Sequence, residues 1–154
     1  MARLNVSAVT LVDLVDLAAN MRASDAREMR AYGGGRDTIH ALLDATLVSM
    51  MSWAVRINGE LVAVFGCAPI NLLTGQGSPW MLATPLLSKH ARILVRETPH
   101  YIARMLAVFP HLVNFVHTEN HASIRWLRRL GFTVHPPVPH GAPGEKFHPF
   151  EMRA

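Results

Sequence analysis

The sequence predicts a single domain of the α/β (α+β) class that covers residues 1–154. Three observations support this prediction. Half of the residues are hydrophobic, which is enough for one buried core. Residues 53–68 have the pattern of two strands joined by a tight turn, and residues 112–135 have that of a strand, a helix and a second strand. Strands and helices therefore alternate along one chain, which is typical of α/β domains.

The N-terminal third of the sequence predicts one strand and three helices. Residues 4–9 have a strand pattern, and Thr10 is a suitable N-cap for a helix directly after them. Further helices are expected over residues 25–32 and 38–51. The side chains expected to face the core are Leu11, Leu14, Val15 and Ala18 in the first helix and Ile39, Leu42, Leu43, Leu47 and Met50 in the third.

Gly33, Gly34 and Gly35 separate the second and third of these helices. A glycine-rich turn can hold phosphate, but a P-loop also needs a preceding buried strand and a following Lys-Ser/Thr. Neither is present in this sequence, so we interpret the triplet as a hinge or a plain loop.

The middle of the sequence predicts a hairpin, a further strand and two helices. Asn58-Gly59 supplies the positive φ angles of a type I′ turn between strands at residues 53–57 and 60–68. After a loop over residues 71–79, a strand is expected at 80–84. Helices are expected over residues 87–95 and again from Thr98-Pro99, where Thr can cap and Pro can occupy the first turn. The apolar face of the second helix is Ile102, Met105, Leu106 and Phe109.

The stretch from Asn120 to Phe132 predicts a short helix with both ends marked. Asn120 is a good N-cap, and Gly131 can adopt the left-handed conformation that ends a helix, with Phe132 folding back onto Leu127. The expected buried face is Ile124, Leu127 and Leu130. Residues 112–117 and 132–135 predict strands on either side. Five prolines between residues 136 and 149 predict irregular structure up to about residue 145, followed by a last strand at the sheet edge over residues 146–152.

This unit resembles the C-terminal acyl-CoA-binding segment of the GNAT acetyltransferase superfamily. In that superfamily an Asn-x-x-Ala/Ser opens the helix and Leu-Gly-Phe closes it, and Asn120, Ser123 and Leu130-Gly131-Phe132 match these positions. The resemblance implies a central mixed, mostly antiparallel sheet flanked by helices and splayed between the fourth and fifth strands. The chain is most similar to small GNAT-like proteins of short-tailed bacteriophages, which share Trp80-Met81-Leu82-Ala83-Thr84 and Trp126-Leu127 in pattern.

The resemblance also implies where acetyl-CoA would bind as co-substrate. The pantetheine would pair with the backbone of the central strand, and Asn120 and Ser123 would lie at the start of the acyl-CoA-binding helix. The central-strand residues are Met81, Leu82, Ala83 and Thr84. The family's glycine-rich pyrophosphate loop is missing, since residues 85–97 hold no glycine. Lys89, Arg92 and Arg96 recur at helical spacing and could meet the phosphates instead, although a solvated basic helix face accounts for them equally well.

Two residues are candidates for catalysis. The family's tyrosine acid is replaced by Leu127, whereas His117 and Glu119 lie at a strand end where either could take a proton from an amine. His117, Glu119 and His121 do not have the spacing of a zinc motif, so no metal site is expected. The resemblance therefore implies an acyl-CoA-dependent N-acetyltransferase that transfers an acetyl group to an unidentified amine. The alternative is a catalytically weak or silent phage protein with a virion-structural or host-interaction role.

Composition excludes several other classes of protein. The net charge is +4, but the basic residues are scattered, which argues against a nucleic-acid module. Prolines and glycines interrupt the one uncharged run before it could span a membrane. The single cysteine, Cys67, excludes an intramolecular disulfide and predicts a buried, unreactive thiol. We therefore expect a cytoplasmic protein, in the host bacterium or the virion if phage-encoded, whose partners are acetyl-CoA, an amine acceptor and possible virion or host proteins.

Overall fold

The computed structural model describes residues 3–33 and 37–154. The chain forms strands and helices in the order β1 (Leu4–Ser7), α1 (Leu11–Asn20), α2 (Ala23–Tyr32), α3 (Thr38–Val48), β2 (Met51–Ile57), β3 (Glu60–Asn71), β4 (Gln76–Ala83), α4 (Leu86–Lys89), α5 (Ala91–Val108), β5 (His111–His117), α6 (His121–Leu130), β6 (Thr133–Val134), β7 (Val138–Pro139) and β8 (Lys146–Arg153).

The strands form one mixed sheet in the order β1-β2-β3-β4-β5-β8-β6, with β7 also paired to β8. Every pair is antiparallel except β4 with β5, which is parallel. The predicted fold class is confirmed. The predicted position of the last strand is wrong, because β8 is not at the edge: it pairs with β5 on one side and with β6 and β7 on the other.

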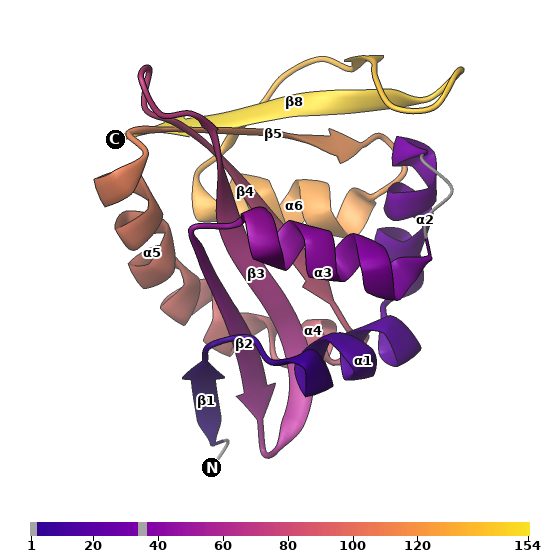
Figure 1. The fold of residues 1–154 in the computed structure, drawn as a ribbon, viewed down its shortest axis with the longest axis vertical. Coiled ribbons are helices and arrows are strands. Elements are labelled where there is room, and N and C mark those ends of the chain that lie inside the picture. The colour runs from indigo at the N-terminus through magenta and orange to yellow at the C-terminus, as the bar shows by residue number, and fades with distance from the viewer. Residues whose placement is uncertain (1–2, 34–36) are drawn as a thin grey trace.

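Helices cover both faces of the sheet. Figure 1 shows α1 and α3 in front of the central strands and α5 and α6 behind them, with α2 beside the end of β5. Each face has its own core. Leu14, Leu17 and Leu42 pack with Leu61 and Val64 on the α1–α3 face. The larger core on the other face includes Phe65, Leu94, Ile102, Met105, Phe109, Leu112, Val116, Ile124, Trp126, Phe132 and Phe150.

Several helix and strand ends lie where local sequence signals predict them. The Thr10 side chain accepts from the Asp13 N–H while Asp13 accepts from the Thr10 N–H, so the N-cap of α1 is a reciprocal capping box. Asn58 and Gly59 turn the β2–β3 hairpin with φ angles of 52° and 82°. Gly131 ends α6 with a φ of 100°, and the Phe132 N–H donates to the Leu127 carbonyl (3.0 Å).

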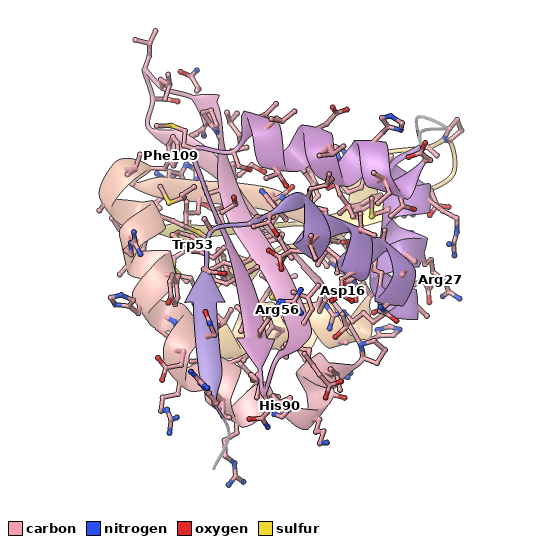
Figure 2. The ribbon with its side chains drawn as sticks, turned by 60° about the horizontal axis from the view of Figure 1, so that its bottom comes forward. Asp16, Arg27, Trp53, Arg56, His90 and Phe109 are labelled. Atoms are coloured by element: carbon pink, nitrogen blue, oxygen red, sulfur yellow. The ribbon has the colours of Figure 1, made fainter. Side chains whose placement is uncertain are left out.

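Other predicted elements need correction. The helix predicted to start at Thr98 does not: α5 runs unbroken from Ala91 to Val108 through Pro99, and the break falls at His90, which Figure 2 labels. The predicted loop over residues 71–79 is shorter, because β4 already begins at Gln76. Residue 51 belongs to β2 rather than to the third helix. Of the glycine triplet, Gly34 and Gly35 lie outside the described residues.

The inward faces predicted for α1 and α3 are partly wrong. Leu14 and Leu42 are buried as expected, but Leu11, Val15, Leu47 and Met50 are exposed. Leu17 takes the second core position of α1 instead. On the polar side of α1, Arg56 of β2 forms ion pairs with Asp13 (2.9 Å) and Asp16 (3.2 Å), and Figure 2 shows Arg56 beside Asp16.

Cys67 is fully buried in β3, as the sequence predicted, and burial raises the pKa of its thiol to about 12. At neutral pH the thiol is therefore protonated and unreactive. Across residues 3–33 and 37–154, none of the helices combines the length and the apolar character that a bilayer crossing requires.

Candidate active site at the gap between two parallel strands

The candidate site begins where β4 and β5 separate. Their parallel ladder holds two residue pairs, Gln76 with His111 and Gly77 with Leu112. The remaining residues of these two strands, all of them described, are not paired with one another, and β5 pairs along its whole length with β8 instead. A gap therefore opens between β4 and β5, as expected for a sheet splayed between its fourth and fifth strands.

The backbone groups of β4 alternate between β3 and this gap. The Thr84 N–H donates to the Val62 carbonyl (3.0 Å), which assigns Thr84 to a hydrogen-bonded pair with β3. Because such pairs recur every second residue in an antiparallel ladder, Leu82 also bonds to β3. Met81 and Ala83 consequently direct their N–H and C=O groups toward β5 and the gap.

The narrow end of the gap is held by Asn114 of β5. Its amide Nδ2 donates to the Pro79 carbonyl of β4 (2.7 Å), just past the last ladder pair, while its Oδ1 accepts the Phe115 N–H (2.8 Å). One side chain thus replaces the backbone bond that the diverging strands no longer make.

The wide end is held by Asp25 of α2, which is fully buried. Its Oδ2 accepts the Ala83 N–H (2.8 Å) and the Arg22 Nε–H (2.7 Å), and its Oδ1 accepts the Asn120 Nδ2–H (3.2 Å). Arg22 in turn donates its N–H to the Ala83 carbonyl (2.8 Å) and a guanidinium N–H to the Ser123 hydroxyl (2.7 Å). Asp25 therefore ties α2, the end of β4 and the start of α6 together.

These hydrogen bonds reduce the number of residues that could pair with pantetheine, for which the sequence predicted the four residues 81–84. Leu82 and Thr84 are engaged with β3, and Ala83 is engaged with Arg22 and Asp25. Met81 presents its N–H and C=O to the gap itself. Of the four residues, Met81 is therefore the one that remains a candidate for backbone pairing with pantetheine. Of the matched helix residues, Asn120 is buried as the α6 N-cap, and Ser123 reaches the cavity described next.

A cavity of about 250 Å³ occupies the gap. Its lining comes from both faces of the sheet: Glu28, Met29 and Tyr32 of α2 with Ala41, Leu42 and Ala45 of α3 on one face, and Leu94, Thr98, Ile102 and Met105 of α5 with Trp126, Leu127 and Leu130 of α6 on the other. Met81 and Asn114 lie between them. The cavity therefore crosses the sheet and could hold two reactants that meet from opposite faces.

Glu28 is the one carboxylate among the described residues that line this cavity. Its Oε1 accepts the His117 N–H (2.6 Å). Burial raises the pKa of the Glu28 carboxyl, and the nearby charge of Asp25 raises it further, against the lowering effect of the hydrogen bond. A carboxylate with a raised pKa beside an apolar cavity is suited to accept a proton near neutral pH.

The predicted bases His117 and Glu119 lie elsewhere. The buried His117 ring accepts the Glu119 N–H at Nδ1 (3.1 Å), so its proton lies on Nε2, which contacts Glu145 Oε2 (2.5 Å). Both ring nitrogens are thus engaged. His117, Glu119 and Glu145 border a second, polar depression together with Arg27 and Arg30 of α2. His117 reaches the main cavity through its backbone N–H to Glu28.

The predicted phosphate-binding cations are exposed at the junction of α4 and α5. Lys89 ends α4, Arg92 lies in the first turn of α5, and Arg96 lies one turn further and pairs with Glu97 (3.4 Å). The structure brings these three residues to one region, apart from His117 and Glu119. Among the described residues, no group of three or more His, Cys, Asp or Glu side chains is arranged to hold a metal ion.

The sequence interpretation missed the residues that α2 contributes to the site. Arg22, Asp25, Glu28 and Tyr32 all lie at or on this helix, whose composition is that of an exposed polar helix. Their spacing in the sequence could have identified them. Asp25, Glu28 and Tyr32 fall at i, i+3 and i+7, so they share the helix face that turns toward the sheet.

No protein-family model matches the sequence, and no curated protein is similar enough to count as a relative. Solved structures do match over nearly the whole chain. An N-acetyltransferase from Staphylococcus aureus Mu50 is 13% identical with a TM-score of 0.72, and the match covers 98% of each chain. The ribosomal-protein-S18-alanine N-acetyltransferase from Escherichia coli is 16% identical with a TM-score of 0.67, covering 98% of this chain and 94% of that one.

A third similar structure is the spermidine N-acetyltransferase from Vibrio cholerae in complex with CoA and spermine. It is 11% identical with a TM-score of 0.68, and the match covers 97% of this chain and 95% of that one. At these identities the likeness concerns the fold, and the chain has the fold of the GNAT acetyltransferases.

Proposed function

We propose that the chain is an acyl-CoA-dependent N-acetyltransferase of GNAT type, which transfers an acetyl group from acetyl-CoA to an amine. The observation that carries this proposal is the cavity that crosses the sheet at the β4–β5 gap, with Met81 in the gap and Glu28 on the α2 side. A donor and an acceptor can meet there from opposite faces, which converts a bimolecular transfer into a positioned one.

Acetyl-CoA would bind on the α5–α6 side. The N–H and C=O of Met81 can pair with the pantetheine amides, and Ser123 lies beside the cavity at the start of α6. Lys89, Arg92 and Arg96 supply the positive charge for the phosphates in place of a glycine loop. Asn120, through its bonds to Asp25 and Ser123, holds the start of α6 against β4.

Glu28 would act as general base on the acceptor side. An ammonium group loses a proton to Glu28, its nitrogen attacks the thioester carbonyl, and the carbon–sulfur bond breaks as the carbon–nitrogen bond forms. The attacking nitrogen then loses a second proton, and water carries this proton to the leaving CoA thiolate, because Leu127 lines the cavity where the superfamily has a tyrosine. His117 is then a positioning residue for Glu28, and the earlier predictions of His117 or Glu119 as base become alternatives that the same assay can test.

The first experiment measures the melting temperature with CoA and with dephospho-CoA. CoA stabilises the folded chain by mass action, and added salt weakens the effect if exposed cations meet the phosphates. Arg92→Ala reduces the shift, whereas the control Arg128→Ala, which removes an exposed arginine near the far end of α6, does not. Equal melting shifts in both variants would show that these cations do not bind the CoA phosphates.

The second experiment measures the release of CoA thiol against acceptor concentration. Glu28→Gln lowers kcat by about 10²–10⁴-fold, the usual contribution of a general base, while the exposed control Glu60→Gln leaves it unchanged. Full activity in Glu28→Gln, together with a loss of activity in His117→Ala or Glu119→Gln, would show that the general base lies in the second depression.

A catalytically silent GNAT-fold protein is the second candidate. The observations that favour it are Leu127 in place of an acid and the absence of glycine from residues 85–97. CoA binding without acceptor-dependent thiol release would support this candidate, and a virion or host-interaction role would then be the function to examine.

A further inference from the structure

The acceptor side of the cavity has a distinct chemical character. It is built by α2 and α3 with the β4 and β5 residues between them, and its lining is mostly aromatic and aliphatic: Tyr32, Trp80 and Phe115 supply rings, and Met29, Leu42 and Leu82 supply aliphatic surface. Apolar walls with few polar groups are typical of sites that hold small organic molecules.

Each of the three rings contacts a residue that does not line the cavity. Phe115 stacks on His140, with centroids 3.9 Å apart, and Tyr32 packs against Phe147 at 4.7 Å. The Trp80 indole Nε1–H donates to the Ser49 hydroxyl (2.8 Å), so its one polar group is already satisfied. Such rings can contact the hydrocarbon part of a ligand and attract a cation over their faces.

Charge on this lining is limited to one group. Glu28 is the sole carboxylate among the described lining residues, and no lysine, arginine or histidine accompanies it there. A single ammonium group can therefore be neutralised inside the cavity. A second ammonium, as in a polyamine, would lose its hydration without a partner, and a carboxylate on the acceptor would meet Glu28 as a like charge.

We propose that the acceptor is a small primary monoamine with an uncharged apolar body, aryl or alkyl, rather than a polyamine, an amino sugar or an amino acid. This inference rests on the proposed function, since it names the substrate of the same cavity. The ammonium lies at Glu28 and the apolar body lies against Trp80, Tyr32 and Phe115.

Two matched pairs of amines test the proposal. Hexylamine and 1,6-diaminohexane have the same chain and differ in a second ammonium, while 2-phenylethylamine and phenylalanine differ in one carboxylate. The expected result is a kcat/KM at least tenfold higher for hexylamine and for 2-phenylethylamine than for their charged counterparts. A preference for the diamine or for the amino acid would overturn the proposal while leaving acetyl transfer itself intact.

A change of specificity sharpens the test. Ala45 lines the same side from α3, so Ala45→Glu adds a second carboxylate, and we expect the ratio of kcat/KM for 1,6-diaminohexane over hexylamine to rise by at least tenfold. Ala45→Gln is the control of similar size without charge, and it should leave the ratio near the wild-type value. An equal rise in both variants would show that charge does not govern the choice.

Binding without turnover separates this inference from the proposed function. Calorimetry of the CoA-bound protein should give tighter binding of hexylamine than of 1,6-diaminohexane, and Glu28→Gln should weaken hexylamine binding. If hexylamine binds in this way but no thiol is released, acetyl transfer fails as the function and the monoamine site stands. If no monoamine binds to the CoA-bound protein, the inference itself is wrong.

Discussion

The two ends of the β4–β5 gap are held by different means. At the narrow end, two backbone ladder pairs and the amide of Asn114 join the strands. At the wide end no ladder is present in these fully described strands, and the buried Asp25 links Ala83 to Asn120 across the opening. Backbone pairing therefore sets where the gap begins, whereas a charged side chain from α2 sets how far it opens. Changes at the wide end should alter both stability and CoA binding, and changes at the narrow end mainly stability.

Removing the carboxylate of the wide end should have the largest effect. Asp25→Ala leaves the Arg22 guanidinium, the Ala83 N–H and the Asn120 amide without their buried partner, so the free energy of unfolding should fall by about 3–5 kcal/mol. Urea unfolding measures this loss, and the melting shift with CoA should shrink in the same variant.

Asp37→Ala is the control for that prediction. Asp37 is an exposed N-cap that pairs with His40, so its removal should lower the free energy of unfolding far less than the removal of the buried Asp25. A similar small loss in Asp25→Ala would mean that the wide end does not depend on the buried carboxylate.

Crowding the narrow end should have the next largest effect. A Cβ on Gly77 would lie 2.6 Å from two ring carbons of Phe109 and 2.9 Å from the Cys67 sulfur, so Gly77→Ala should lower the free energy of unfolding by about 1–3 kcal/mol. CoA affinity, measured by calorimetry well below the melting temperature, should stay near the wild-type value. Loss of CoA binding with unchanged stability would reverse the roles assigned to the two ends.

Loss of the Asn114 amide should be milder. Asn114→Ala removes the hydrogen bond to the Pro79 carbonyl, and the free energy of unfolding should fall by about 1 kcal/mol. Amide hydrogen exchange at Gln76 and Gly77 should become faster, because the ladder loses the bond that follows it. Unchanged exchange there would show that the two ladder pairs hold the narrow end alone.

The substitution of Glu28 should have the smallest effect on the free energy of unfolding. Unlike the other substitutions, it should raise this free energy at neutral pH. Because the folded state raises the pKa of this carboxyl above its ordinary value of 4.5, folded chains bind more protons than unfolded ones in the window just above that value. The Glu28 contribution to stability is thus highest at low pH and is lost as pH rises through the folded pKa. Glu28→Gln should match the wild type below about pH 4.5 and be the more stable of the two at pH 7, where wild-type Glu28 must be ionised in the folded chain. Urea unfolding at several pH values measures the difference.

The elements predicted well from the sequence are those with local causes. The Asn58-Gly59 turn and the two ends of α6 depend on residues a few positions apart, and each is confirmed. The continuous α5 could not be predicted in this way. Proline inside a helix costs about 3 kcal/mol, but Leu94, before Pro99, and Ile102 and Met105, after it, are buried against the sheet, and their burial outweighs that cost.

The site was predicted less well than the fold for the same reason. The motif around Asn120 and Ser123 is contiguous, so it led to the correct end of α6. Asp25 and Glu28 act across about ninety residues of sequence, on Asn120 and His117, and no local pattern joins these positions. The sequence marks His117 as a histidine at a strand end, but its link to the site is the hydrogen bond from its backbone N–H to Glu28, and every residue except proline carries such an N–H.

The position of β8 between β5 and β6 also has a consequence for the order of assembly during synthesis. Before residues 146–153 leave the ribosome, β5 is held in the sheet by two ladder pairs with β4, and Phe150 is missing from the lining of the cavity. The hairpin of β2 and β3, in contrast, needs no later residue to form. Contacts between distant segments form late in folding. A nascent chain would therefore form the β2–β3 hairpin early, and the lining of its cavity would be complete only when β8 inserts.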